Sequence, residues 1–276
     1  MQNRSCIPGQ ETRSEMTRFY QTSEKYLQGL NLKDEGYFKS YISIIQKHLP
    51  SRSKVLDLAC GNGFSSFLLA KIGYEVTGVD ISHLFIKNAT INNGLSYVAG
   101  DALALPFKDA CFGAIACFEG IEHFPNVDNA LREMMRVIRR KGLIIIVSPN
   151  LLSPFLPLKD IVFMALGREG RATWAENMPQ SFRWLVTNTR STVTKLLSSE
   201  PVFCYRGPNL LTAEHGDADS VYLSTQIDIV RFLRAHGMVI LRITGEGLTV
   251  ISKITARMFP YLKTWMAIVA RKDAVQ

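Results

Sequence analysis

The sequence predicts an α/β fold built on a mostly parallel sheet. Strand and helix patterns alternate five times between residues 54 and 147, and the alternation resumes at residue 225 after an interruption. Residues 143–147 are apolar throughout, which is typical of a strand covered on both faces. Repeated strand–helix units imply parallel strands with right-handed crossovers. At 276 residues and 47% hydrophobic content, the chain is expected to fold as a single domain, 1–276, with one insertion.

The first 50 residues are expected to be helical. Residues 1–13 are polar and contain Pro8 and Gly9, which are typical of an irregular segment. Ser14–Leu27 and Gly36–Leu49 then space aromatic and aliphatic residues at helical intervals. We therefore predict two helices ahead of the sheet.

Five strands and their connecting helices follow in order. The last of these helices is predicted over Asp128–Arg140, with Asp128 as its N-cap and Gly142 as its stop. The basic run Arg139-Arg140-Lys141 would then complement the helix dipole. The five strands are expected at residues 54–58, 75–79, 95–99, 112–117 and 143–147.

The strand–helix pattern returns near the C-terminus. A helix is predicted over Thr225–Ala235, with a capping threonine at its start and Gly237 at its end. Strands are expected at Met238–Thr244 and Thr264–Ala270. We therefore assign 51–150 and 225–276 to the core and 151–224 to an insertion. Because ligands bind beyond the carboxyl ends of strands in open α/β sheets, this insertion is expected to emerge beside the site.

One stretch has the pattern of a nucleoside-binding turn. Residues 55–63, Val-Leu-Asp-Leu-Ala-Cys-Gly-Asn-Gly, are typical of a buried strand followed by a glycine-containing turn. Gly61 and Gly63 permit positive φ and a close approach of a ligand to the backbone. Asp80 and Asp101 follow the next two strands, where carboxylates can accept hydrogen bonds from ribose hydroxyls and an adenine amine. The sequence therefore predicts a nucleoside site at this edge of the sheet.

These motifs resemble class I S-adenosylmethionine-dependent methyltransferases, of the small-molecule, methyltransferase type 11 kind. Ala59 stands where the family usually has its first glycine. The resemblance implies a Rossmann-like seven-stranded sheet of order 3-2-1-4-5-7-6, with strand 7 antiparallel. It also implies that the helices of residues 1–50 act as a lid over the cofactor. The blocks that carry the resemblance are residues 57–63, 79–82, 100–107 and 118–124.

The resemblance implies S-adenosyl-L-methionine as the cofactor and S-adenosyl-L-homocysteine as its product. Asp80 would hold the ribose and Asp101 the adenine, while Glu119 would bind the methionine amino group or the acceptor. The expected cofactor-binding residues are Asp57, Ala59, Cys60, Gly61, Asn62, Gly63, Asp80, Ile81, Gly100, Asp101, Ala102, Phe118 and Glu119.

Methyl transfer from a sulfonium is an in-line displacement, which needs alignment, exclusion of water and removal of a proton from a hydroxyl acceptor. His123 is the predicted general base because imidazole titrates near neutral pH, although it can instead hold its loop. Glu119 is the second catalytic candidate. We expect a small biosynthetic acceptor, methylated at oxygen first and at nitrogen or carbon next. The insertion 151–224 is expected to cap it, with Asn150, Trp174 and Trp184 in contact.

Three other functions match parts of the sequence. A nicotinamide dehydrogenase would use Gly61-x-Gly63-x-x-Ser66, but the chain lacks a second domain for a hydride acceptor. A non-catalytic S-adenosylmethionine-binding protein would keep the same turn, and the sequence does not exclude it. A formal net charge of +8 suggests a nucleic-acid methyltransferase. The basic residues are dispersed, however, and residues 118–121 lack the motifs of that class, so nucleic acid is not the expected partner.

We expect no metal and no membrane span. His215, Asp217 and Asp219 are of metal-ligating types, but we interpret them as a polar loop that closes over the acceptor. The five cysteines form no C-x-x-C pair, and the most apolar tract is broken by prolines and charges. These features favour a soluble cytoplasmic protein with reduced thiols. They do not predict an oligomeric state.

Overall fold

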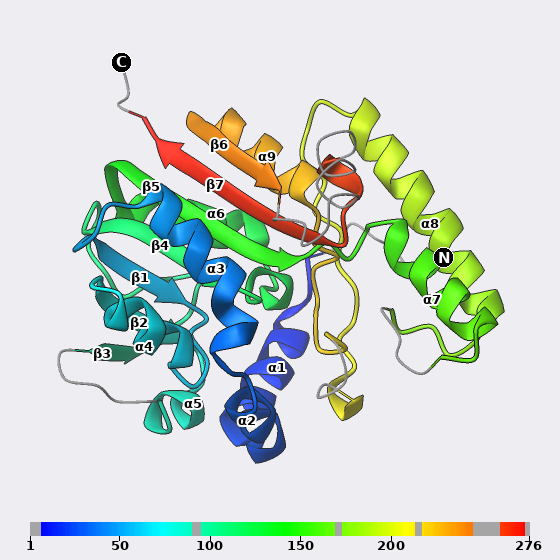
Figure 1. Ribbon diagram of the computed structural model, residues 1–276, viewed down its shortest axis with the longest axis horizontal. Helices are drawn as coiled ribbons and strands as arrows, with labels where there is room; N and C mark the ends of the chain where they lie inside the picture. The colour runs from blue at the N-terminus through cyan, green and yellow to red at the C-terminus, as the bar shows by residue number, and fades with distance from the viewer. Residues whose placement is uncertain (1–6, 90–94, 169–172, 213–216, 245–259, 274–276) are drawn as a thin grey trace.

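The computed structural model describes residues 7–89, 95–168, 173–212, 217–244 and 260–273. A seven-stranded sheet of order β3-β2-β1-β4-β5-β7-β6 forms its centre (Figure 1). Strands β1 to β5 pair in parallel, and β7 is antiparallel to both β5 and β6. The predicted fold class and strand order are confirmed. The strands are β1 (Lys54–Leu58), β2 (Glu75–Asp80), β3 (Ser96–Ala99), β4 (Phe112–Phe118), β5 (Ile138–Pro149), β6 (Met238–Thr244) and β7 (Trp265–Lys272).

Helices cover both faces of the sheet (Figure 1). On one face, α3 (Glu35–His48) and α4 (Phe64–Lys71) pack against Val55 and its neighbours on the sheet. On the other, α6 (Val127–Val137) and α9 (Gln226–Ala235) pack against the cluster that contains Leu56. Successive residues of a strand point to opposite faces, so the continuous apolar runs of the sequence supply both clusters.

Two helices precede α3. The structure divides the predicted helix Ser14–Leu27 into α1 (Gln10–Thr22) and α2 (Glu24–Asn31), because Ser23 leaves helical geometry and its side chain accepts a hydrogen bond from the Tyr26 N–H. The Ser82 hydroxyl donates to the Tyr20 carbonyl at 2.6 Å, which fastens α1 to the segment after β2. The short helix α5 (His83–Lys87) contacts α1 there. Helix α1 therefore lies over the carboxyl end of the sheet.

The predicted end of the helix before β5 is wrong. Helix α6 ends at Val137, and β5 starts at the next residue, so Arg139-Arg140-Lys141 lie in a strand. The pairing of β5 with β4 shifts register here, and Lys141 has φ +62°. A Cβ on Gly142 would stand 2.8 Å from the Arg139 carbonyl oxygen. The glycine thus permits a β-bulge and does not stop a helix, and the basic run is exposed on that bulge.

The predicted N-cap of α6 is also wrong. Asn126 is the cap, and its side chain accepts a hydrogen bond from the Asn129 N–H at 3.1 Å. Asp128 lies in the first turn and pairs with Arg132. Both positions suit an acidic or amide side chain, so composition alone did not separate them.

The insertion has two parts. Helices α7 (Phe155–Ala165) and α8 (Met178–Leu197) contact each other and form a hairpin at the edge of the molecule (Figure 1). The chain then returns through residues 201–225 to α9. Among the described residues, no helix has both the length and the apolar character needed to cross a bilayer. The part of the chain that the structure describes also contains the short 3-10 helices η1 (Ile121–His123), η2 (Leu210–Thr212) and η3 (Pro260–Leu262).

Candidate functional site

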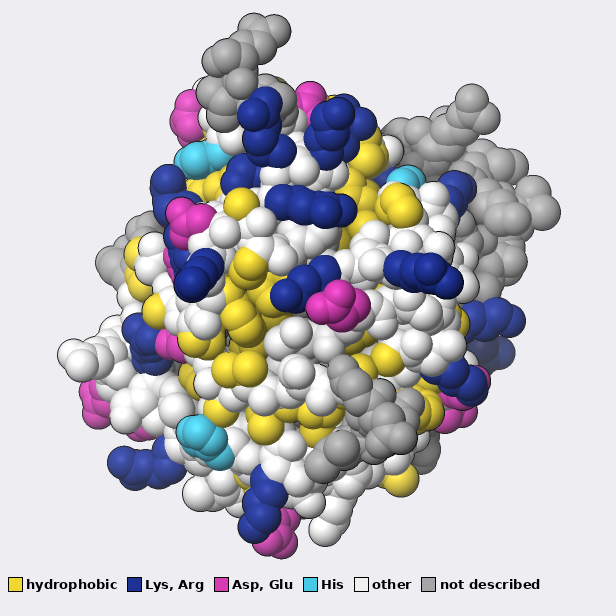
Figure 2. Space-filling model, turned by 90° about the vertical axis from the view of Figure 1, so that its left-hand side faces the viewer, with side chains coloured by type: hydrophobic (Ala, Val, Ile, Leu, Met, Phe, Trp, Pro, Cys, Tyr) yellow, Lys and Arg dark blue, Asp and Glu magenta, His cyan; other side chains and the backbone are white. Residues whose placement is uncertain are grey.

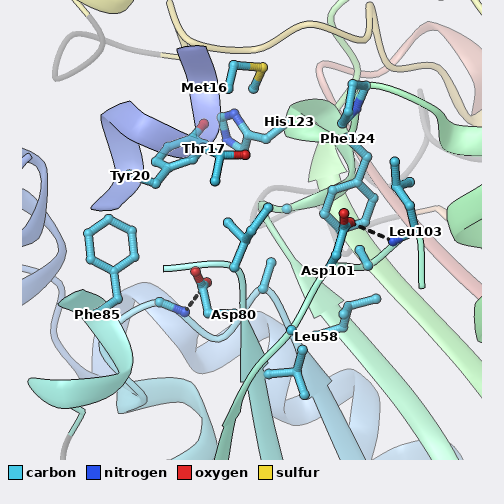
Figure 3. Close-up of a pocket in the computed structure, with 18 of the residues that line it drawn as sticks. Met16, Thr17, Tyr20, Leu58, Asp80, Phe85, Asp101, Leu103, His123 and Phe124 are labelled. Atoms are coloured by element: carbon cyan, nitrogen blue, oxygen red, sulfur yellow. Dashed lines mark hydrogen bonds between the residues drawn. The ribbon is translucent and has the colours of Figure 1, made fainter. Parts of the chain in front are cut away.

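A cavity lies at the carboxyl ends of the strands, beneath α1 (Figure 3). Its volume is about 850 Å³, a figure that includes open solvent at its mouth. Figure 3 shows Met16, Thr17 and Tyr20 of α1 on one side of this cavity, facing Asp80 and Asp101 on the other. A second cavity of about 510 Å³ adjoins it. The two share Tyr26, Leu30, Ala59, Gly61, Glu119 and His123 as lining residues.

The glycine-containing turn after β1 borders both cavities. Ala59, Gly61 and Gly63 all have positive φ, of 59°, 55° and 79°. A Cβ on Gly63, the N-cap of α4, would lie 2.6 Å from the Tyr97 hydroxyl, so only glycine suits this position. The turn therefore brings bare backbone at Gly61 to both cavities, and Cys60 and Asn62 line the second.

Asp57 lies behind the turn and supports it. Its buried carboxylate accepts hydrogen bonds from the hydroxyls of Ser65 (2.6 Å), Ser66 (2.7 Å) and Tyr41 (3.1 Å). Burial raises the pKa of Asp57, and these hydroxyls oppose that rise. Asp57 lines neither cavity, so the structure gives it the role of tying β1 to α4 and α3, whereas the sequence predicted a cofactor contact.

Asp80 ends β2 and lines the main cavity. The Gly61 N–H donates to its Oδ2 and the Ser82 N–H to its Oδ1, each at 2.9 Å. Burial raises the pKa of Asp80, while the two backbone donors lower it. Each oxygen keeps a lone pair for a ligand, which fits two vicinal hydroxyls.

Asp101 follows β3 and lines the same cavity. Its Oδ1 accepts a hydrogen bond from the Leu103 N–H at 2.8 Å, and its Oδ2 pairs with Arg13 of α1. Ile81, Ala102 and Leu103 add apolar walls beside it, and Gly100 completes the loop. A flat base between these walls would have a carboxylate at its edge. The two carboxylate acceptors and the apolar walls therefore fit a nucleoside such as that of S-adenosylmethionine.

Glu119 stands between the two cavities in a strained backbone conformation. Its φ is +48°, and it accepts a hydrogen bond from the Lys33 ammonium at 2.8 Å and another from the Tyr37 hydroxyl. Lys33 also lies 4.6 Å from the centre of the Tyr37 ring. Strained non-glycine residues are concentrated at functional sites. Next to it, Phe118 lines the second cavity and packs against Phe38.

His123 is held by a buried carboxylate from the insertion. Its Nδ1 lies 3.2 Å from the Asp219 Oδ2, and the Tyr20 hydroxyl donates to the same oxygen at 2.7 Å. Asp219 is buried, whereas His123 lines both cavities. The contact is a close charge pairing without hydrogen-bond geometry at Nδ1, so Asp219 favours the charged form of the imidazole.

The charges around His123 set its protonation. Burial lowers the pKa of His123, but the nearby carboxyl groups of Asp219, Glu122 and Asp217 outweigh burial and raise it above the ordinary value of 6.5. Burial raises the pKa of Glu122 to about 8, although His123 opposes that rise. The raised pKa of His123 favours the charged imidazolium, and the raised pKa of Glu122 favours its protonated carboxyl group. A proton-accepting role of His123 requires this proton to leave first.

Three of these side chains are of kinds that can bind a metal ion. Candidate ligand atoms of Glu122, His123 and Asp217 lie within 4.8 Å of one another. Glu122 also accepts a hydrogen bond from the Ser148 hydroxyl at 2.9 Å through its Oε2. His215, which the sequence grouped with Asp217, lies outside the described residues. That the protein works without a metal stays a prediction.

The expected acceptor-binding residues lie elsewhere. Asn150 donates to the carbonyls of Tyr261 (3.0 Å) and Lys263 (2.8 Å), which fastens β5 to the segment before β7. Trp174 and Trp184 pack against each other, with ring centroids 5.7 Å apart. None of the three lines either cavity, where Asp217 is the lining residue that the described part of 151–224 supplies.

Trp174 instead supports the loop that carries Asp219. Arg206 stacks on the Trp174 ring, 3.6 Å from its centre, and donates to the Ser220 carbonyl at 2.9 Å. The Val221 and Tyr222 N–H groups both donate to the Glu122 carbonyl at 2.9 Å. The returning segment of the insertion is therefore fixed against η1, beside His123.

The basic residues form no single patch on the face in Figure 2. This is the end of the sheet away from the cavities, turned toward the viewer from Figure 1. Lys and Arg side chains are spread over it among acidic, apolar and neutral ones. Such a distribution gives no continuous track for a phosphate backbone.

Similar proteins agree with this geometry. A family model described as a methyltransferase domain matches residues 56–146. A 2-methyl-6-phytyl-1,4-hydroquinone methyltransferase of Synechocystis is 35% identical over 107 residues, which are 37% of this chain and 34% of that protein. A demethylmenaquinone methyltransferase of Thermobifida fusca is 32% identical over 164 residues, 56% of this chain and 69% of that protein. The chain thus spans about a third to two thirds of these curated relatives.

Solved structures share the fold at low identity. The cyclase SpnF has a TM-score of 0.59 at 14% identity, with 98% of this chain and 100% of that chain covered. An S-adenosylmethionine-dependent methyltransferase from Mesorhizobium loti has a TM-score of 0.55 at 16% identity, with 84% and 97% covered. These likenesses show the fold alone. Together with the Thermobifida relative and the matched domain, they show that the chain belongs to the class I S-adenosylmethionine-dependent methyltransferases.

Proposed function

We propose that this protein transfers the methyl group of S-adenosylmethionine to a hydroxyl-bearing aromatic acceptor of the hydroquinone type. The observation that carries the proposal is His123, which Asp219 holds at 3.2 Å where the two cavities meet. The printed names of the curated relatives, a phytyl-hydroquinone and a demethylmenaquinone methyltransferase, support the acceptor class.

The main cavity is the proposed cofactor site. Asp80 would accept hydrogen bonds from the ribose hydroxyls and Asp101 from the adenine amine, while Gly61 admits the ligand to the backbone. The bound cofactor supplies a methyl group on a positively charged sulfur, which needs no further activation. The chain must therefore align the two substrates, exclude water and handle one proton.

Arg13 and Lys33 now pair with two of the proposed cofactor contacts, Asp101 and Glu119. Arg13 belongs to α1, and Lys33 lies in the connection between α2 and α3. We infer that cofactor entry exchanges these ion pairs for ligand contacts, with α1 and α2 moving as a lid. A lid of this kind would close the site against water during transfer.

The second cavity is the proposed acceptor site, with His123 as its base. The imidazole, once neutral, would accept the phenolic proton, and Asp219 would stabilise the resulting imidazolium. Deprotonation makes the phenolic oxygen a strong nucleophile and raises the electron density on the ring carbons ortho and para to it. We place oxygen first, ahead of nitrogen or carbon, because methylation at a ring carbon passes through a non-aromatic dienone and needs a second proton transfer to restore the ring.

Turnover with methyl-labelled cofactor tests this proposal. We expect label to appear in 1,4-hydroquinones, with product analysis by NMR to assign the methylated atom. His123→Ala should lower kcat by about 10²- to 10⁴-fold, the usual contribution of a general base. Its Kd for S-adenosylhomocysteine should stay near that of the wild type. His83→Ala is the matched control, since His83 is exposed and lines neither cavity.

Two outcomes would refute the proposal. Full turnover by His123→Ala would show that His123 is not the general base. Tight S-adenosylhomocysteine binding without transfer of label to any phenolic acceptor would favour a non-catalytic binding protein. Label in RNA or DNA would favour the nucleic-acid alternative.

A further inference from the structure

Helix α8 turns its polar face toward the protein and its apolar face toward solvent, the reverse of an ordinary surface helix. Its inner face is polar: Ser181, Asn188, Thr192 and Lys195 are all buried. Its outer face is apolar, with large side chains in contact with solvent. The exposed ones are Phe182, Val186, Val193, Leu196 and Leu197, which recur at helical spacing and are between 47% and 84% exposed. A surface helix normally turns its apolar stripe to the core.

Three residues of the polar inner face bond to neighbouring segments. The Asn188 amide donates to the carbonyls of Leu151 and Ser153, each at 3.2 Å, and the Thr192 hydroxyl donates to the Leu152 carbonyl. Lys195 forms a buried ion pair with Asp228 of α9. These bonds fix the rotation of α8, so its apolar stripe cannot turn inward without breaking them.

Helix α7 repeats the arrangement. Asp160 is buried on its inner side and accepts a hydrogen bond from the Thr173 N–H at 2.9 Å. Its exposed side carries Phe155, Leu158, Val162 and Leu166, each at least 40% exposed. The hairpin therefore presents apolar stripes on both helices, at the edge of the molecule in Figure 1. Contiguous exposed apolar surface of this kind marks an interaction site.

The charges beside the stripes are positive. Among the described residues of 155–197, the exposed basic residues are Lys159, Arg168, Arg183 and Arg190, against one exposed acid, Glu176. Arg183 and Arg190 lie three residues before and four residues after Val186, so both neighbour it on the helix surface. The whole chain has a net charge of +8. Such a surface complements an anionic one and repels its own copy.

We propose that the α7–α8 hairpin docks on an anionic phospholipid membrane. Apolar side chains with flanking arginines are the pattern of a helix that lies in the headgroup region. The purpose of docking, to draw an acceptor with an apolar tail from the bilayer, rests on the proposed function; the docking itself does not. The hairpin follows the carboxyl end of β5, and Trp184 of α8 packs on Trp174 beside Arg206. The docked face is thus connected to the loop that holds His123.

Sedimentation with vesicles tests the apolar stripe. The full chain should sediment with vesicles of phosphatidylglycerol and phosphatidylcholine in equal parts, and much less with phosphatidylcholine alone. Phe182→Glu with Val186→Glu should lower the partition constant by at least about tenfold, because two apolar side chains are replaced by anions. The matched control is Leu211→Glu with Val239→Glu, which changes two exposed apolar residues outside the hairpin and should bind like the wild type.

A second pair of variants tests the charge. Each arginine near an anionic surface contributes about fivefold to the partition constant, so Arg183→Glu with Arg190→Glu should lower it by roughly 25-fold or more. Arg140→Glu with Lys141→Glu changes the net charge equally on the exposed bulge of β5, and should lower it far less. Added salt should weaken wild-type binding in the same direction.

Other readouts separate this proposal from its alternatives. Hairpin variants that bind phosphatidylglycerol vesicles as well as the wild type would overturn it. A second result would also overturn it: the wild type is a dimer in light scattering, the Phe182→Glu, Val186→Glu variant is a monomer, and the wild type does not bind vesicles. The hairpin would then be a contact between two copies of the chain. S-adenosylhomocysteine binding should be unchanged in all hairpin variants. Vesicle binding without any methyl transfer would refute the proposed function but not the proposal that the hairpin docks on a membrane.

Discussion

Replacing Asp80 with asparagine tests the cofactor site at its most constrained residue. Both carboxylate oxygens already accept a backbone N–H, from Gly61 and from Ser82, at 2.9 Å each. Asparagine offers one oxygen, so one of these N–H groups would face an NH2 group without an acceptor. An unsatisfied buried donor costs about 1–3 kcal/mol. For a chain of this size, we expect the midpoint of thermal unfolding to fall by roughly 2–10 °C.

The same change should weaken the cofactor. Hydrogen bonds to a charged group contribute about 1.5–3 kcal/mol each, and a ribose would lose one or both of them. A loss of about 2.8 kcal/mol corresponds to a Kd for S-adenosylhomocysteine about 100-fold higher. Titration calorimetry measures this change in Kd.

Asp128→Asn is the control for Asp80→Asn. It is the same substitution at a half-exposed carboxylate on α6, whose partner is Arg132. It should change neither the Kd nor the unfolding temperature measurably. An unchanged Kd in folded Asp80→Asn would refute the placement of the ribose, and with it the cofactor site argued above.

Four further results are expected. Turnover should rise with pH through a value above 6.5 as His123 loses its proton, and Asp219→Asn should move this rise to lower pH because the nearest negative charge is gone. The pKa of Glu122 is raised to about 8 in the folded protein, whereas in the unfolded chain this carboxyl group loses its proton near pH 4.5. The free energy of unfolding should therefore fall as pH rises between these two values. Glu122→Gln should reduce that fall by on the order of a few kcal/mol. Ala59→Gly should stabilise by about 0.5–1 kcal/mol, since glycine relieves φ +59° but loses more backbone entropy. Treatment with EDTA should leave turnover unchanged.

Each of these has a clear contrary result. A pH profile that Asp219→Asn leaves in place would show that another group titrates. Parallel stability curves for wild type and Glu122→Gln would mean that the buried carboxyl ionises normally. Loss of stability in Ala59→Gly would show that the alanine methyl group contributes more than its backbone costs. Activity that EDTA removes and a divalent cation restores would assign Glu122, His123 and Asp217 to a metal.

The sequence failed where a neighbour in space decided the outcome. The basic run Arg139-Arg140-Lys141 follows a strongly amphipathic segment, so local pattern extended the helix through it. Pairing with β4 ends α6 at Val137 and places the run in a bulge. Local periodicity carries no record of such partners.

By itself, the sequence determined the elements and their order: apolar runs at strand length, the glycine-containing turn at residues 55–63, and carboxylates after β2 and β3. These signals are local, because a strand covered on both faces and a turn with positive φ each restrict their own residues. Strand order came with the family resemblance, and the structure confirmed it.

Only the tertiary structure decided which side chains share the site. Tyr20 and Asp219 are 199 positions apart, yet they bond to each other beside His123. Lys33 reaches Glu119, Arg13 reaches Asp101, and the expected contacts Trp174 and Trp184 support a loop and do not line the cavities. The polar side of α8 also faces inward because of distant residues: the carbonyls of residues 151–153 accept hydrogen bonds from Asn188 and Thr192. Contacts of this range depend on how whole elements pack, which no local pattern of residues encodes.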